Sequence, residues 1–430
     1  MEPPYHKRLN FQRIDPCCIM DHNTRIFAQN ADDFSSVIEK KHAWSRSLSE
    51  TRLANAVILP LRANENFPAT KGGYLGGVLN EALCFAAGSS VEEPRFSCAA
   101  GYSVAPGELI TCPETVVFGG IFYDHFGVML LLSLTRFWWI VRHEQCPYRI
   151  IFLAESVAAE SYAAELMKIC HIPRSRYEIL REPTRYAAVI LPDEVLSSVR
   201  GEIDPCFMDP FRFMRDTILR EDGPCECRKL YLSRRKYLSG GINPGFNEEY
   251  YENFFARRGF SVFHPQEHTL REQIRTVASA DELVSTYGTL AHLASLFAGA
   301  GASQLMLLRS SRVDGWFDAE AAILELQSLN WSIVEATKNP YPTLHDNGVF
   351  LYYPTSYFRS YLREQNIPFE ERELESNISD NQMTKYVVRW VECYSDPLYF
   401  RKLGQPSLFP VLQALYFSIS GKKLDPKDYL

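Results

Sequence analysis

From Ala56 to about residue 330, short apolar runs rich in β-branched residues alternate with longer amphipathic segments. No other feature of the sequence constrains the fold as strongly. The runs are apolar at successive positions and not at every second one, which is typical of strands covered by helices on both faces. Strands that alternate with helices in this way usually form parallel sheets. We therefore predict an α/β protein.

The alternation falls into two cycles, separated at 221–227 by the polar segment EDGPCEC. The first cycle predicts strands at 56–61, 115–122, 148–154 and 186–193, with helices at about 125–143, 156–170 and 207–221. The second predicts strands at 228–235, 260–265, 282–288 and 303–309, with helices at about 247–258, 269–280, 289–299 and 317–329. Long chains usually divide into domains. We expect an N-terminal arm (1–55), two Rossmann-like domains (56–222 and 223–340) that face a cleft, and an aromatic-rich helical extension (341–430).

The bulk composition excludes some classes of protein. A net charge of −7 argues against bulk binding of nucleic acid. The longest apolar run, Met129 to Val141, contains Arg136 and is shorter than the ~20 residues of a spanning helix, so it predicts a buried helix. Because the N-terminus shows no signal-peptide pattern, we expect a cytoplasmic location, with peripheral association at the inner membrane face left open. The 11 cysteines have no zinc-type spacing, and no metal site is expected.

The most informative segment is 229–259, where a predicted strand ends in Ser233, Arg234, Arg235 and Lys236. A glycine-containing loop follows, and then a helix that opens with Asn247 and Glu248. Arginine can bind phosphate oxygens with both arms of its planar guanidinium, so this strand end suits a diphosphate. The alternative is a solvated charge run at a strand edge.

A second segment places a turn at Tyr287 and Gly288 between a predicted strand and a helix that starts at Thr289. The free N–H groups and the positive dipole end of a helix favour phosphate. His292 lies one turn into this helix. The alternative is an ordinary strand–turn–helix with a histidine in the core.

A third segment, 119–139, places Asp124 and His125 after a strand and before an apolar helix. A carboxylate and an imidazole at such a position can act in general base catalysis. The alternative is that Asp124 caps the helix and His125 packs against Phe122.

These segments together resemble glycosyltransferase family 61, which includes bacterial capsular-polysaccharide transferases. The resemblance is carried, over about 115–310, by GGIFYDHFG…SLTRFW, EPTRYAAVILP, KLYLSRRK, GFNEEYYENFFARRGFSVFHPQEHTLREQIRTVASADELVS and STYGTLAHLASLFAGAGA. It implies a GT-B-like arrangement and inverting, metal-independent transfer of a hexose or pentose from a nucleotide sugar, UDP-linked, to a glycan or lipid-linked glycan.

The resemblance also implies roles for residues. Arg234 and Arg235 would hold the donor phosphates, with Ser233, Lys236, Asn247, Glu248 and Tyr287 beside them. Gly288, Thr289 and His292 would complete the donor site, and Asp124 and His125 would be catalytic.

The sequence departs from the family pattern at positions where relatives usually carry polar groups. Val128 replaces a second histidine, Leu132 replaces an acid, and Tyr287 stands where relatives often have histidine. If the usual acid or histidine is the base, this chain uses another group or is inactive. Two rivals therefore remain: an inactive GT-B-fold component of polysaccharide assembly, and a nucleotide-sugar enzyme such as an epimerase.

The last part of the chain clusters aromatic residues at Tyr352, Tyr353, Tyr357, Phe358 and Tyr361. Such rings can stack on sugars. We favour a role in the core or in contacts between copies of a homo-oligomer.

Overall fold

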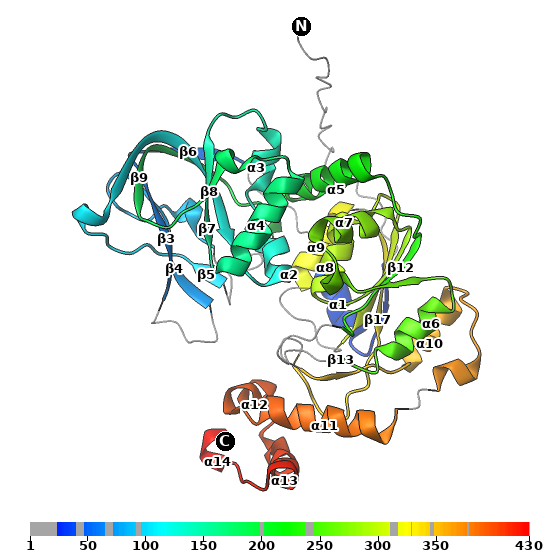
Figure 1. Ribbon diagram of the computed structural model, residues 1–430. Coiled ribbons are helices and arrows are strands. Elements are labelled where there is room, and N and C mark those ends of the chain that lie inside the picture. Colours follow the sequence, from blue (N-terminus) through cyan, green and yellow to red (C-terminus); the bar gives the residue numbers. More distant parts are fainter. Residues whose placement is uncertain are drawn as a thin grey trace.

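The structure is a computed structural model that describes residues 24–39, 47–64, 72–91, 96–197, 202–236, 245–309, 317–327, 329–344, 348–375 and 378–429. These residues form two large sheets, one of eight and one of six strands, with helices packed around them (Figure 1). The predicted α/β class is confirmed.

The first sheet has the order β5-β4-β3-β9-β6-β7-β8, and β2 also pairs with β9. Its strands are β2 (Glu50–Ala54), β3 (Val57–Ala63), β4 (Gly72–Leu79), β5 (Phe96–Cys98), β6 (Ile110–Phe122), β7 (Arg149–Ala154), β8 (Tyr177–Ile179) and β9 (Thr184–Pro192). Strands β9, β6, β7 and β8 are parallel neighbours. In contrast, β3 runs antiparallel to both β4 and β9. The expectation of a parallel strand at 56–61 is therefore wrong, because the connection from Ala63 to Gly72 is too short for a parallel crossover.

The second sheet has the order β1-β17-β16-β15-β12-β14, and all its strands are parallel. They are β1 (Arg25–Phe27), β12 (Lys229–Leu232), β14 (Ser261–Phe263), β15 (Glu282–Thr286), β16 (Ser303–Leu308) and β17 (Asn330–Glu335). Along the chain, β14 lies on one side of β12 and β15 lies on the other. This is the strand order of a doubly wound sheet, whose switch point lies between β12 and β15.

Helices cover both faces of the second sheet, as the apolar strands predict. They are α1 (Ala31–Ile38), α6 (Glu249–Ala256), α7 (Leu270–Ser279), α8 (Thr289–Phe297), α9 (Phe317–Gln327) and α10 (Ser356–Glu364). Leu230 and Leu232 share a core with α7 and α8, whereas Tyr231 between them joins a second core with α6 and α10. Each strand therefore buries successive side chains on opposite faces.

The two ends of the chain are divided between units. In the predicted arm, β1 pairs with β17 of the second sheet and β2 pairs with β9 of the first. In the predicted extension, β18 (Phe350–Leu351) pairs with β13 (Gly245–Phe246), and helix α10 packs on the second sheet. Tyr352 and Phe358 are buried in that core, which confirms the interpretation of these two aromatic residues as core.

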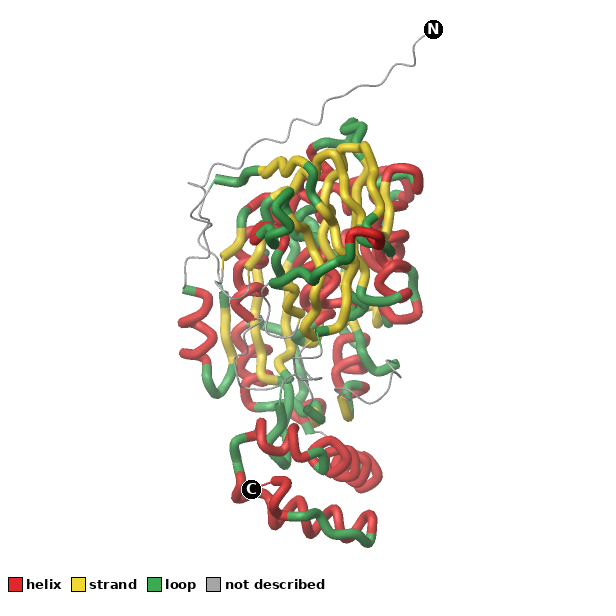
Figure 2. Tube along the Cα trace, turned by 90° about the vertical axis from the view of Figure 1, so that its left-hand side faces the viewer, coloured by secondary structure: helices red, strands yellow, loops and turns green. Residues whose placement is uncertain are grey.

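The remaining C-terminal helices form a cluster with its own core. They are α11 (Asp380–Tyr394), α12 (Pro397–Leu403), α13 (Phe409–Ser420) and α14 (Pro426–Tyr429). Figures 1 and 2 show this cluster at one end of the molecule, beyond the second sheet. No helix in the described part of the chain is both long and apolar enough to cross a membrane.

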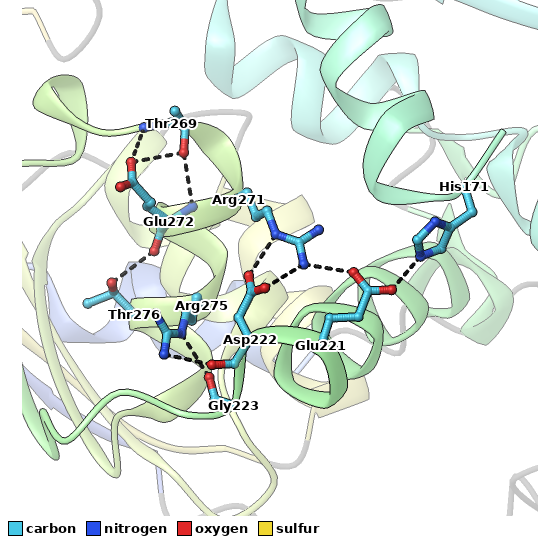
Figure 3. Close-up of polar contacts among 9 residues, drawn as sticks. All are labelled: His171, Glu221, Asp222, Gly223, Thr269, Arg271, Glu272, Arg275 and Thr276. Atoms are coloured by element: carbon cyan, nitrogen blue, oxygen red, sulfur yellow. Dashed lines mark hydrogen bonds and ion pairs between the residues drawn. The ribbon is translucent and has the colours of Figure 1, made fainter. Parts of the chain in front are cut away.

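Helix α5 (Asp209–Asp222) connects the two sheets and packs against helices of both. Phe211 on α5 meets Phe297 on α8 edge to face, at a ring separation of 5.4 Å. Figure 3 shows the polar contacts between α5 and its neighbours. Arg271 of α7 donates to Glu221 and to both carboxylate oxygens of Asp222, and we call this contact region around α5 the seam. His171, after α4 (Val157–Ile169), contacts the same Glu221. Apolar and ionic contacts therefore join the two units.

The single helix predicted at about 125–143 is interrupted. The structure has α2 (Phe126–Val128), a π-helical turn (Met129–Ser133) and α3 (Phe137–Arg142). Arg136 lies at the break and is 1% exposed. Its guanidinium donates to the carbonyls of Pro192 and Gly88 and to Glu194, at 3.2, 2.6 and 2.8 Å. A buried cation therefore connects this break to β9 and to the turn after β4.

We expect Arg136→Leu to lower the free energy of unfolding by about 3 kcal/mol, because it leaves Glu194 and two carbonyls without their buried partner. Urea unfolding measures the change. Arg52→Leu on exposed β2 is the matched control and should change stability by less than about 0.5 kcal/mol. Equal effects of the two substitutions would contradict this role of Arg136.

Candidate functional site

Three neighbouring strands of the second sheet bring the candidate donor-site residues to their carboxyl ends. Ser233 and Arg234 follow β12, Gly288 connects β15 to α8, and Arg309 follows β16. Strands β12 and β15 also flank the switch point. Doubly wound sheets bind their ligands outside the carboxyl ends of the strands at this point.

Arg309 lies directly against the start of α8. Gly288 has a φ of 109°, and a Cβ added there would lie 2.6 Å from Arg309 Nη2. Only glycine fits this conformation and this close approach. The guanidinium is 5.1 Å from the centre of the Phe350 ring, and Arg309 is 4% exposed. A buried cation therefore adds to the positive end of the α8 dipole, and both favour an anion.

Arg234 follows β12, which only β15 separates from β16 in the sheet. Burial raises the pKa of the Tyr352 hydroxyl, the Glu248 carboxylate raises it further, and Arg309 and Arg234 act against the rise. Both guanidinium groups therefore act electrostatically on one hydroxyl. The sequence indicated Arg234 but not Arg309. Arg309 shows the pattern that indicated Arg234, a basic residue at the end of an apolar strand, and this pattern could have revealed it.

The other predicted cations of this strand end are held by acids. Arg235 is 2.9 Å from Glu249 and 3.1 Å from Glu252, and Lys236 is 2.9 Å from Glu267. Ser233 is buried and donates to Glu252. The structure thus directs Ser233 and Arg235 toward α6, and Lys236 toward the turn after β14.

Asn247 and Glu248 lie just before α6, and Glu248 contacts the end of β12. Helix α6 begins at Glu249, so the helix predicted from Asn247 starts later, and Asn247 has a left-handed φ of 63°. Its side chain donates to the Tyr352 carbonyl at 3.0 Å. Glu248 is 2% exposed and accepts from the Arg234 backbone N–H at 3.0 Å. Burial raises the pKa of Glu248 to about 7, despite opposing contributions from Arg234.

Tyr287 and His292 point into the core. The Tyr287 ring is 5.8 Å from Phe317 and is buried. His292 Nδ1 hydrogen-bonds Glu320 of α9, and both residues are buried. The structure thus gives His292 the alternative position considered above, a histidine within the core.

Asp124 and His125 lie where the first sheet meets this region. A Cβ added at Gly127 would lie 2.7 Å from Thr289 Oγ1 and 3.5 Å from His125 Cε1. The start of α2 therefore touches the start of α8 at Gly127 and Thr289. His125 Nδ1 accepts from the Val128 N–H at 3.4 Å, so the imidazole caps α2. The structure brings together two segments that the sequence had indicated separately.

Glu155, at the end of β7, is a polar residue that the sequence did not reveal. It accepts from the Asp124 N–H at 3.1 Å and from the Tyr74 hydroxyl. Burial raises the pKa of Glu155 above its usual value, and the hydrogen bonds from Tyr74 and Asp124 oppose this rise. Two carboxylates thus lie together at the carboxyl ends of β6 and β7. Tyr74 comes from a strand of the antiparallel part of the sheet, which explains why no sequence pattern indicated this contact.

Two cavities lie elsewhere in the first unit. One, of about 520 Å³, is lined by Arg149, Arg174 and Arg181, whose charges are already engaged by Glu178, the Tyr177 carbonyl and Glu160. The other, of about 410 Å³, lies between the ends of α3 and α4. Neither includes the residues above. Among the described residues, no group of three His, Cys, Asp or Glu side chains is arranged to hold a metal ion.

No protein-family model and no curated protein matches this chain. Among solved structures, domain III of the replication initiation protein DnaA from Thermotoga maritima is similar over 51% of this chain and 75% of that chain, with 13% identity and a TM-score of 0.13. A likeness of this size carries no argument about fold or function.

We expect Gly127→Ala to destabilise the protein by about 1–3 kcal/mol, because the new methyl group overlaps Thr289 Oγ1. Adding Thr289→Ala to Gly127→Ala should restore most of the loss, because it removes that oxygen. Thermal unfolding of both single variants and the double variant measures the coupling. Additive effects would show that α2 and α8 do not meet here.

We expect stability to depend on the protonation of Glu248. The folded pKa, about 7, exceeds the ordinary glutamate value of 4.5, so the contribution of Glu248 to stability is complete below pH 4.5 and is lost as the pH rises through about 7. The Glu248→Gln variant should lack this loss, which amounts to about 3 kcal/mol. Denaturant unfolding as a function of pH measures it. Glu249→Gln, at an exposed neighbour, is the control and should follow the wild type.

Proposed function

We propose that this chain is an inverting, metal-independent glycosyltransferase that moves a sugar from a UDP-linked nucleotide sugar to a hydroxyl of a glycan. The observation that carries the proposal is the arrangement at the carboxyl ends of three neighbouring strands, where Arg234 follows β12, α8 follows β15, and Arg309 after β16 lies against Gly288. Two guanidinium groups and a helix N-terminus suit a diphosphate.

On the donor side, the leaving nucleoside diphosphate gains negative charge as the bond to the sugar breaks. Arg234, Arg309 and the first N–H groups of α8 lie where they can stabilise this charge without a metal ion. Arg309 takes the place that the resemblance gave to Arg235, because Arg235 is ion-paired with Glu249 and Glu252.

On the acceptor side, Asp124 is an exposed carboxylate next to the contact between Gly127 and Thr289. In the proposed reaction it removes the proton from the acceptor hydroxyl while that oxygen attacks the anomeric carbon. Glu155 positions Asp124 by accepting its backbone N–H. His125 is a second candidate base on the same turn.

The proposal includes a GT-B-like arrangement, in which the first unit binds the acceptor and the second binds the donor. Membership of glycosyltransferase family 61, a role in capsular or other cell-surface polysaccharide synthesis, and a cytoplasmic location belong to the same proposal. The sequence segments that resemble the family support it, since they include Asp124, Arg234 and Thr289.

One observation favours a second candidate, an inactive GT-B-fold component of polysaccharide assembly. Val128 and Leu132, where relatives usually carry polar groups, are both buried and apolar. If no other residue acts as the base, the site binds a nucleotide sugar and does not turn it over.

We expect Arg234→Ala and Arg309→Ala each to lower kcat/KM for sugar transfer by about 100-fold or more, because each removes a group that stabilises the leaving charge. Arg257→Ala, at an exposed arginine of α6 paired with Glu373, is the matched control and should keep full activity. Transfer to a glycan acceptor, followed by mass spectrometry with each nucleotide sugar in turn, measures the rate.

Asp124→Asn separates the two candidates. A transferase should lose turnover and keep the rise in melting temperature that UDP produces in the wild type. An assembly component should show that rise and no turnover in either protein. Full activity of both arginine variants would contradict the proposed donor site.

A further inference from the structure

Helix α13 carries no charged residue along FPVLQALYFSIS. Only Phe409 and Leu412 are buried in the C-terminal core. Val411, Phe417 and Ile419 are 39%, 51% and 44% exposed. The other large apolar side chains that are exposed in the described residues, Leu83, Ile110 and Val157, are scattered over the first unit. Exposed apolar surface is therefore concentrated on α13.

Most of the exposed residues share one face of the helix, whereas Ile419, two turns after Leu412, lies on the opposite side. Pro410, Ala414 and Phe417 recur at helical spacing, and Val411 and Ser418 lie beside them. Ser418 is the one polar residue of this face. Leu412 and Phe409 lie on the opposite side and hold the helix to α11, α12 and α14. Apart from Ser418, this exposed face is apolar.

Basic residues accompany this face. Gly421 ends α13 in a left-handed conformation, and Lys422 and Lys423 follow at once, both exposed. The stretch from Arg401 to Tyr429 contains five basic and two acidic residues, whereas the whole chain has a net charge of −7. The apolar helix therefore lies in a locally basic part of an acidic protein.

The position of the helix leaves it accessible. Figures 1 and 2 both place α11–α14 at one end of the molecule, beyond the second sheet. The cluster has a core of its own.

We propose that α13 docks this protein onto an anionic lipid surface, with the face of Val411, Ala414 and Phe417 entering the headgroup–acyl boundary and Lys422 and Lys423 contacting the headgroups. An apolar helix face with lysines beside it is the combination that binds at the interface of charged membranes. The inference stands on α13 alone and does not depend on sugar transfer.

The charges favour lipid over a second copy of the chain. In a symmetric dimer the same patch of both copies meets, so two stretches of like net charge, each with five basic and two acidic residues, would lie together. Like charges brought together in this way oppose association. An anionic membrane instead attracts them.

Co-sedimentation of the full chain with vesicles tests the proposal. We expect binding to equimolar phosphatidylcholine and phosphatidylglycerol, weak binding to phosphatidylcholine alone, and a decrease at high salt. Phe417→Glu and Val411→Glu together should abolish binding. Lys422→Ala and Lys423→Ala should each weaken it by roughly fivefold.

Val157→Glu and Lys168→Ala, at exposed positions of α4, are the matched controls and should bind as the wild type does. Thermal unfolding should show that all variants remain folded. Equal vesicle binding by wild type and the double Glu variant would overturn the proposal. A dimer that forms without vesicles and is lost in that variant would also overturn it, and would assign the face to a second copy.

Discussion

The absence of a side chain at Gly127 allows the two α/β units to meet at the carboxyl ends of their strands. Any Cβ at this position would overlap Thr289, so the starts of α2 and α8 come together only because the residue is glycine. The contact joins the carboxyl end of β6, with Asp124 and His125, to the carboxyl end of β15, with Gly288. Phe211, Phe297 and Arg271 support the same seam from the side of α5. The arrangement of the polar groups from both sheets depends on this contact.

Ion pairs with acidic residues determine which basic side chains near the second sheet can bind an anion. Arg235 and Lys236 lie in ion pairs with Glu249, Glu252 and Glu267. Glu248 is buried, and its raised pKa means that it carries less than a full negative charge near pH 7. Burial of this carboxyl group therefore weakens the negative charge next to Arg234.

The C-terminal helices α11–α14 pack around a different core. Their core is separate from the cores of the two large sheets, but it includes Phe246 and Leu351 of the β13–β18 pair. Helix α13 uses Phe409 and Leu412 for this packing and leaves Val411 and Phe417 outside. The side of α13 with Phe409 and Leu412 holds the helix in place, and the side with Val411 and Phe417 is exposed and can bind a partner. In the proposed function, such an anchor would keep a transferase near lipid-linked acceptors.

The sequence by itself determined most strands and helices, because periodicity and end signals act over a few neighbouring residues. Strands β6, β7, β9 and β12, and helices α4, α5, α7 and α8, lie close to their predicted positions, and Asp124, Arg234 and Thr289 lie at the predicted strand ends. Only the tertiary structure decided which strands pair and which side chains converge. The pairing of β1 with β17 joins residues about 300 positions apart, and the contacts of Arg309 with Gly288 and of Glu155 with Tyr74 cross from one strand to another. Local sequence patterns carry no record of such contacts, because packing and burial of the whole chain select them.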